Sequence, residues 1–191
     1  MKIVAIVGSP RSNGNTSCLV DEALQEAAGQ GMETEKIMLG EHWVGPCLGH
    51  ENCPSFSECL QKDDAPWILE RFREADGIIL GSPVYYYTIT AQMKAFIDRN
   101  YFLYTHGIPL KARCAGTIAV AGGAGLERTD RDLRRFARMV TSLPEEKVVS
   151  VSGYASKPGD VKSNMPLLGE ARALGARMVE MLTSPDTTLT P

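Results

Sequence analysis

Three short runs of apolar residues constrain the fold of this chain more than any other feature. They are residues 2–8 (KIVAIVG), 76–82 (DGIILGS) and 115–121 (AGTIAVA), and none alternates polar with apolar side chains. A strand with this composition is covered by other structure on both faces, as in the middle of a parallel sheet. Parallel strands need crossover connections, which are usually helices. The runs therefore predict a sheet with helices on both faces.

The segments between these runs complete the pattern. We expect a weaker strand at 33–39 and the last strand at 147–152, with helices at 19–28, 66–74, 91–103, 130–141 and 167–182. Five strands separated by helices predict an α/β fold, a doubly wound five-stranded parallel sheet. With 191 residues, we expect residues 1–191 to form a single domain. One connection is long: residues 40–65 separate the second strand from its helix, where about 2 to 6 residues are usual.

Composition argues against several kinds of partner. The net charge of -3 and the pI of about 5.7 give no reason to expect nucleic acid or an anionic membrane. No apolar run approaches the roughly 20 residues that span a bilayer, and the chain starts with a strand rather than a leader peptide. We therefore expect a cytoplasmic protein whose five cysteines are reduced and whose partners are small molecules.

Ligands of a doubly wound sheet bind beyond the carboxyl ends of the strands. The first loop there, GSPRSNGNTS (residues 8–17), precedes a predicted helix and suits a phosphate group. Its neutral donors are Ser9, Ser12, Asn15, Thr16 and Ser17. The loop matches neither the Rossmann pattern nor the P-loop. The alternative is a polar turn in which Asn15 or Thr16 caps the helix.

The next two loops suit a flat ring. SPVYYYTITAQMKAFIDR (residues 82–99) contains Pro83 and three consecutive tyrosines that can stack on an aromatic ligand. AGGAGLERT (residues 121–129) holds glycines that let backbone amides approach a planar group. The alternatives are half-buried aromatic residues at a strand end and a flexible turn. Together the three loops predict a site for a mononucleotide with a flat ring system.

These three segments resemble the flavodoxin-like NAD(P)H-dependent FMN reductase family. The resemblance implies the strand order 2-1-3-4-5 and FMN at the switch point of the sheet. In the mechanism that we expect, no side chain needs to act as acid or base. It places the phosphate of FMN on Ser9, Arg11, Ser12, Asn13, Asn15 and Thr16. It places the isoalloxazine ring on Pro83, Val84, Tyr85, Tyr86, Gly122 and Gly123.

The long connection contains CLGHENCPSFSEC, residues 47–59. It resembles the compact C-x2-C-x2-C-x(4 to 7)-C knot of the iron-sulfur flavoproteins in the same superfamily, with His50 at the second position. The implied ligands are Cys47, His50, Cys53 and Cys59. They favour a [4Fe-4S] cluster with His50 or an exogenous ligand on the fourth iron. Cys3His is also an ordinary zinc set, and an empty or disulfide-closed loop is the third alternative.

Other candidates for chemistry have simpler interpretations. His42 is a further candidate ligand that we interpret as a surface residue, and Cys18 and Cys114 are predicted to be core thiols. Arg128, Arg131, Arg135 and Arg138 lie along one side of a predicted helix and could attract the phosphates of NADPH or form a subunit contact. Because Glu127, Asp130 and Asp132 lie among them, a solvated helix face is favoured.

The sequence therefore predicts an FMN-binding oxidoreductase. Electrons would come from NAD(P)H or ferredoxin and pass to a small acceptor or a ferredoxin-type partner. The insertion could reach the flavin of a neighbouring subunit, so we expect a homodimer or homotetramer. Two rivals stay open: a non-enzymatic electron carrier with FMN and a [4Fe-4S] cluster, and a flavin-free relative with a structural zinc loop.

Overall fold

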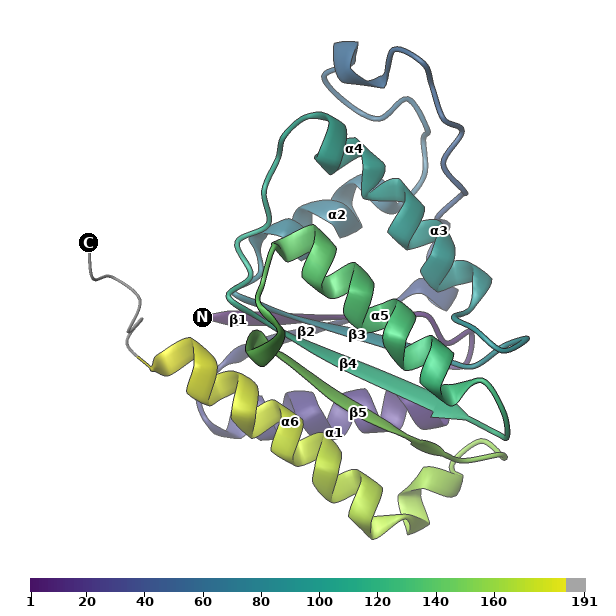
Figure 1. Cartoon of the computed structure of the whole chain (residues 1–191), viewed down its shortest axis with the longest axis vertical. Helices are drawn as coiled ribbons and strands as arrows, with labels where there is room; N and C mark the ends of the chain where they lie inside the picture. The colour runs from purple at the N-terminus through teal and green to yellow at the C-terminus, as the bar shows by residue number, and fades with distance from the viewer. Residues whose placement is uncertain (185–191) are drawn as a thin grey trace.

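The structure, a computed structural model, describes residues 1–184 and is built on a five-stranded parallel sheet (Figure 1). The strands are β1 (Lys2–Val7), β2 (Glu33–Met38), β3 (Gly77–Pro83), β4 (Cys114–Ala121) and β5 (Val148–Tyr154). Their order is β2-β1-β3-β4-β5, and every neighbouring pair is parallel. The predicted fold class and flavodoxin-like strand order are confirmed. The predicted domain end at residue 191 lies outside the described residues.

Helices cover both faces of the sheet, as the apolar strands require. One face carries α1 (Asn15–Gly29) and α6 (Met165–Thr183), and the other carries α2 (Ala65–Glu74), α3 (Ala91–Arg99) and α5 (Leu126–Thr141). In β1, Ile3 points into the first core, and Val4, its neighbour, points into the second. Complete burial of such a side chain contributes about 1.5 to 3 kcal/mol. Strands buried on both sides have no polar face, which explains their uninterrupted apolar sequence.

Three predicted helices differ from the observed ones. The helix predicted at 19–28 begins four residues earlier, at Asn15. The helix predicted at 91–103 is divided into α3 and the short α4 (Tyr101–Thr105). At the break, the side-chain amide of Asn100 donates to the Phe96 carbonyl at 2.9 Å, while the Asn100 backbone N–H donates to Ile97 O at 3.1 Å. The side chain thus takes the carbonyl that a continuous helix would use. The predicted helix start at residue 130 was also late, because α5 begins at Leu126.

The insertion between β2 and α2 is present as predicted and holds only two single-turn 3-10 helices, Leu39–Glu41 and Cys53–Ser55. It extends away from the sheet beside α4 (Figure 1). Among the described residues, no helix has the length and apolar character needed to cross a membrane.

Candidate functional site

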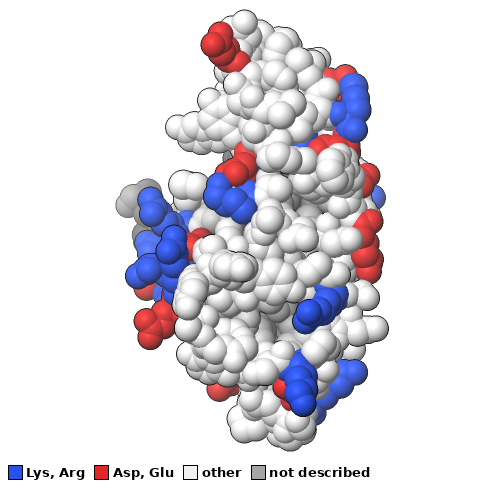
Figure 2. Space-filling view, turned by 90° about the vertical axis from the view of Figure 1, so that its right-hand side faces the viewer, with Lys and Arg blue, Asp and Glu red and all other residues white. Residues whose placement is uncertain are grey.

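A cavity opens at the edge of the sheet where the parallel strands end. Its volume is about 200 Å³, and it is lined by loops that follow β1, β3, β4 and β5. The lining residues are Ser9, Arg11, Gly14, Asn15, Thr16, Pro83, Val84, Tyr85, Val120, Gly122, Ala155, Ser156 and Pro158. Figure 2 shows this side of the molecule, where most of the surface is uncharged. Eight of the twelve residues predicted to bind FMN line this one cavity; Ser12 and Asn13 are exposed and do not.

The loop after β1 turns tightly so that the N-terminus of α1 faces the cavity. Ser9 is only 3% exposed, and its hydroxyl accepts from the Arg11 backbone N–H at 3.1 Å. The Gly14 N–H donates to the Arg11 carbonyl at 3.1 Å. A Cβ added at Gly14 would lie 3.1 Å from both Arg11 O and Ser9 Oγ, so a larger residue would crowd the turn. The loop therefore depends on a glycine directly before the helix.

The N-terminus of α1 is open to a ligand. Its N-cap residue is Gly14, no side chain caps it, and its first turn holds no acidic residue. The alternative that Asn15 or Thr16 caps this helix is therefore wrong. Because the first backbone N–H groups of a helix have no partner within the helix, they can bind an anion, which the helix dipole also favours.

Thr16 supplies the clearest sign of a missing partner. Its side chain is 1% exposed, it lines the cavity, and its Oγ1 has no hydrogen-bond partner. Leaving a buried hydroxyl unsatisfied costs about 1 to 3 kcal/mol. An acceptor bound in the cavity would satisfy this hydroxyl.

Asn15 has a bracing role that the sequence did not reveal. Its Nδ2 donates to Lys157 O at 2.8 Å and Ala155 O at 3.3 Å, and its Oδ1 accepts from the Val161 N–H at 3.2 Å. The side chain thus ties the start of α1 to the loop after β5. That loop contributes Ala155, Ser156 and Pro158 to the cavity, and we did not predict it. Its position could have indicated this role, because the loop follows β5 of the same sheet.

The three tyrosines form a strained two-residue turn. Tyr85 N–H donates to Thr88 O at 3.0 Å and Thr88 N–H donates to Tyr85 O at 3.3 Å, with Tyr86 (φ 48°) and Tyr87 (φ 68°) at the tip. Both φ values lie in the left-handed region, which bulky residues rarely adopt. The turn packs on Gly125 (φ 91°), where an added Cβ would lie 2.6 Å from Tyr87 Cα. Strain of this kind tends to persist at ligand clamps.

A second hollow of about 350 Å³ adjoins the first. It is lined by Val84, Tyr86, Tyr87, Gly122, Gly123 and Ala124. Val84 and Gly122 border both hollows. All twelve predicted residues except Ser12 and Asn13 therefore line one of two adjoining hollows, a polar one at the helix N-terminus and an aromatic one beside it.

The cysteine insertion does not gather its four predicted ligands. Cys47 is exposed, whereas His50, Cys53 and Cys59 are half-buried. Within residues 1–184, no three His, Cys, Asp or Glu side chains form a group that could hold a metal ion. All five cysteines carry free thiols, so the structure contradicts the alternative of a disulfide-closed loop. The predicted ligand set stays a prediction.

The other singled-out histidine and cysteines lie outside this loop. Half-buried His42 packs edge-on against Trp67 with ring centroids 4.9 Å apart. Cys18 packs against the first core, and Cys114 is fully buried in β4. Burial raises the pKa of the Cys114 thiol to about 12, which keeps it neutral and unreactive.

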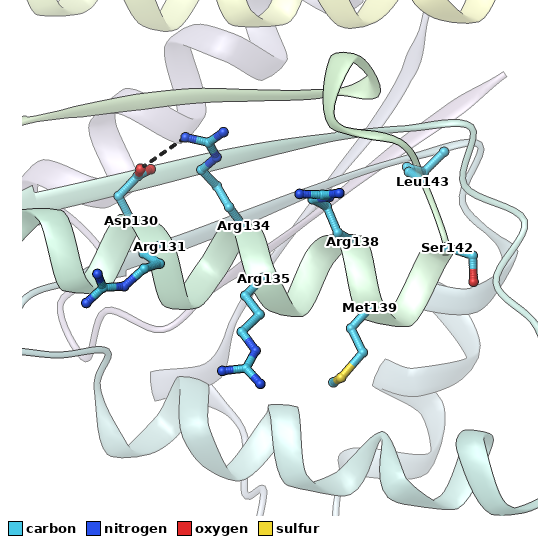
Figure 3. A pocket seen from close by; sticks show the side chains of 8 residues that line it. All are labelled: Asp130, Arg131, Arg134, Arg135, Arg138, Met139, Ser142 and Leu143. Atoms are coloured by element: carbon cyan, nitrogen blue, oxygen red, sulfur yellow. Dashed lines mark ion pairs between the residues drawn. The ribbon is translucent and has the colours of Figure 1, made fainter.

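Arg128, Arg131, Arg135 and Arg138 of α5 are exposed. Figure 3 shows Arg131 and Arg135 on one side of the helix and Arg134 and Arg138 on the opposite side. Arg131, Arg134, Arg135 and Arg138 line an open hollow of about 580 Å³ together with Asp130, Met139, Ser142 and Leu143.

The acidic residues of this helix lie among the arginines, as the favoured mixed face predicts: Asp132 pairs with Arg128 and Asp130 with Arg134, each at 3.8 Å. Asp132 accepts a hydrogen bond from Thr88 at 2.9 Å, and Asp130 accepts one from Ser150. Both carboxylates thus also bind hydroxyls outside α5, one in the tyrosine turn and one in β5.

Comparison with known proteins identifies the family. A match to the NADPH-dependent FMN reductases covers residues 1–156. The chain belongs to this family. An iron-sulfur flavoprotein of Methanocaldococcus jannaschii is 37% identical, over 95% of this chain and 97% of the relative. An iron-sulfur flavoprotein of Archaeoglobus fulgidus is also 37% identical, over 96% of this chain and 81% of the relative.

A solved structure supports the fold of this FMN reductase family member. The structure of RosB with a bound riboflavin-5'-phosphate derivative superposes with a TM-score of 0.73, at 17% identity, over 95% of this chain and 79% of RosB. Membership makes the chain a flavoprotein oxidoreductase dependent on FMN. The two adjoining hollows fit this cofactor, because the unpartnered Thr16 hydroxyl and the open helix N-terminus suit its phosphate and the tyrosine turn suits its ring.

Proposed function

We propose that FMN binds across the two hollows, with its phosphate at the N-terminus of α1 and its ring between the tyrosine turn and residues 122–124. The observation that carries this proposal is the buried, unpartnered hydroxyl of Thr16 in the polar hollow. The backbone N–H groups of the first turn of α1 would bind the phosphate together with this hydroxyl. Arg11, exposed at the rim, would add positive charge.

In this proposal the chain binds and orients, and no side chain acts as acid or base. FMN, when bound, would supply the redox chemistry between NAD(P)H and the acceptor. Tyr86 is 98% exposed, so one side of the aromatic hollow is open to solvent and to an incoming donor or acceptor. This exposure supports a small acceptor or a ferredoxin-type redox partner.

The insertion supports a second cofactor. Three thiols and an imidazole within residues 47–59 are a donor set that suits a [4Fe-4S] cluster, and relatives at 37% identity are iron-sulfur flavoproteins. We propose that Cys47, Cys53 and Cys59 bind such a cluster, with His50 at the fourth iron. A bound group would require the thiols to move closer together, because they do not form a metal site in the described residues.

The test is an absorption spectrum and metal analysis of protein purified without oxygen, before and after FMN is added. We expect one FMN per chain together with iron and sulfide. Protein that stays colourless and contains zinc would support the flavin-free alternative. Flavin bands without iron would leave the FMN proposal standing and reject the cluster.

Steady-state NAD(P)H oxidation, with free FMN or a quinone as acceptor, then separates an enzyme from an electron carrier. We expect turnover with at least one small acceptor. Negligible turnover with every acceptor, together with fast reduction by ferredoxin, would show an electron carrier instead.

A further inference from the structure

A charged side chain is buried where the cysteine insertion meets the rest of the protein. Arg99, the last residue of α3, is 2% exposed although it carries a positive charge. Buried charges are retained only where they are paired and hydrogen-bonded. The partners of Arg99 all come from the insertion, so this arginine is the point at which α3 holds the insertion.

The guanidinium of Arg99 binds three groups at once. Its Nη1 forms an ion pair with Asp63 and donates to Gly45 O at 3.2 Å. Its Nη2 donates to the sulfur of Cys59 at 3.2 Å. The planar fork of an arginine can make such divergent contacts, whereas a lysine offers one compact charge.

Asp63 closes the base of the insertion from the opposite side. Its carboxylate accepts from the Gly45 N–H at 2.9 Å and the Ala65 N–H at 3.1 Å, in addition to Arg99. Gly45 precedes the cysteine segment and Asp63 follows it. The two ends of the segment are therefore fastened together on the same buried guanidinium.

The thiols of the insertion differ in how firmly they are held. Cys59 lies against the buried Arg99, next to this closed base. Within residues 1–184, the Cys53 sulfur accepts one hydrogen bond, a long one of 3.9 Å from the Thr105 hydroxyl, and Cys47 is exposed. Cys59 is thus the thiol that is fixed relative to the rest of the molecule.

The same helix connects Arg99 to the flavin site. Thr90, the N-cap residue of α3, is held by two hydrogen bonds. Its Oγ1 donates to the Gly8 carbonyl at 2.7 Å, and its backbone N–H donates to Ser82 Oγ at 3.1 Å. Gly8 and Ser82 directly precede Ser9 and Pro83, which line the cavity. α3 has 9 residues, which at about 1.5 Å per residue gives a length of roughly 14 Å. It fixes Cys59 at a set separation from the cavity.

We propose that Arg99 is the positioning residue of the cysteine insertion, holding the Cys59 sulfur as the pre-set ligand toward which Cys47 and Cys53 move when a metal ion or cluster binds. This inference rests on the proposed function of the insertion as a metal or cluster loop. Groups that hydrogen-bond to metal ligands orient them, and their loss typically weakens metal affinity about 10- to 100-fold.

The test measures cobalt(II) binding in oxygen-free buffer, because sulfur-to-cobalt absorption reports thiolate ligands. The variants are R99K, which keeps a charge for Asp63 but cannot reach all three partners, C59S, and the double variant R99K/C59S. We expect R99K to bind cobalt(II) about 10- to 100-fold more weakly than the wild type. In the C59S background, R99K should cause little further loss, because Arg99 acts through Cys59.

Arg177→Gln removes an exposed arginine of α6 that pairs with Glu180 and serves as the matched control, with unchanged cobalt(II) affinity. FMN binding and the melting temperature of each variant report on folding. If R99K does not fold, R99Q/D63N replaces it, since this variant removes both buried charges together.

Two results would overturn the inference about Arg99 without affecting the proposed metal loop. One is an R99K variant that binds cobalt(II) as tightly as the wild type. The other is an equal loss of cobalt(II) affinity from R99K in the wild-type and C59S backgrounds. The second result would show that Arg99 only supports the fold of the insertion. A wild-type chain that binds neither cobalt(II) nor iron would instead reject the proposed metal loop, while FMN binding would be unaffected.

Discussion

At the scale of single residues, two buried threonines form a natural comparison. Thr16 and Thr129 both have hydroxyls without a partner, but only Thr16 lines the cavity. We predict that Thr16→Val raises the Kd for FMN about 10- to 100-fold, because a hydrogen bond to a charged group contributes about 1.5 to 3 kcal/mol. The free protein should not lose stability, since valine removes an unsatisfied polar group. Quenching of FMN fluorescence measures the Kd.

Thr129→Val is the control for this prediction. It makes the same chemical change in a residue that is 0% exposed and lies in α5, outside the cavity. The Kd for FMN should stay within about twofold of the wild-type value, because a change that contacts no ligand leaves binding energy unaltered. Equal weakening by both variants would show that the effect of Thr16 comes from packing and not from a contact with the phosphate.

At the scale of local elements, the tyrosine turn stores strain. Tyr86 has a φ of 48° and is 98% exposed, so its conformation is not compensated by burial. Asparagine tolerates this conformation and is favoured in such turns. We predict that Tyr86→Asn raises the free energy of unfolding by about 1 kcal/mol and weakens FMN binding several-fold, because aromatic packing contributes about 0.5 to 1.5 kcal/mol. Urea unfolding and FMN titration measure the two effects.

Tyr104→Asn is the matched control. Tyr104 is also highly exposed, at 82%, but it lies in helix α4 and its φ is not positive. This variant should neither stabilise the protein nor change FMN binding. If Tyr86→Asn leaves FMN binding unchanged, the turn is not the wall of the flavin site.

The ion pair at the base of the insertion should make stability depend on pH. Burial opposes ionisation of Asp63, but hydrogen bonds from Arg99 and the backbone of Gly45 and Ala65 outweigh it and lower the pKa below 3.8. Because the pKa of Asp63 is lower in the folded than in the unfolded state, its ionised carboxylate contributes fully to stability at any pH above the pKa of the unfolded state. We predict that this contribution is lost as the pH falls below about 4 and through the lower folded pKa. Urea unfolding between pH 7 and pH 2 measures the loss.

Asp63→Asn separates this contribution from general acid effects. The variant leaves Arg99 buried without its partner, at 1% side-chain exposure, which costs about 3 to 5 kcal/mol at neutral pH. The difference between the two proteins should then shrink as the pH falls, because protonation removes the same charge from the wild type. A difference that stays constant down to pH 2 would contradict the assignment.

At the scale of the whole molecule, the sequence predicted the features that depend on neighbouring residues and missed those that depend on contacts between distant parts of the chain. β1, β3 and β4 were predictable because burial on both faces leaves an apolar run that can be read locally. β5 carries exposed Ser150 and Ser152 between its apolar residues, and the loop behind it was not considered as part of the site. Its link to the cavity is the contact from Asn15 to Lys157, which are 142 positions apart.

The insertion shows the same limit. Spacing alone identified its three thiols and His50. It did not identify the buried ion pair between Arg99 and Asp63 that holds the insertion, because the two residues are 36 positions apart. An arginine in a helix and an aspartate in a loop are also too common to suggest such a pair. The break of the predicted helix at Asn100 likewise depends on a side chain that competes for a backbone carbonyl. Sequence patterns report burial well, whereas they do not report which polar partners meet.

The division of the site into a phosphate part and a ring part predicts how ligands stabilise the molecule. FMN at about 100 times its Kd should add roughly 2.7 kcal/mol to the free energy of unfolding. For a domain of this size, that raises the melting temperature by roughly 5 to 10 °C. Riboflavin has the same ring but no phosphate, so at equal concentration its shift should be much smaller. In Thr16→Val the two shifts should approach each other, because the variant weakens only the phosphate contact. Equal shifts for FMN and riboflavin in the wild type would show that the N-terminus of α1 is not a phosphate site and that the ring alone provides the affinity.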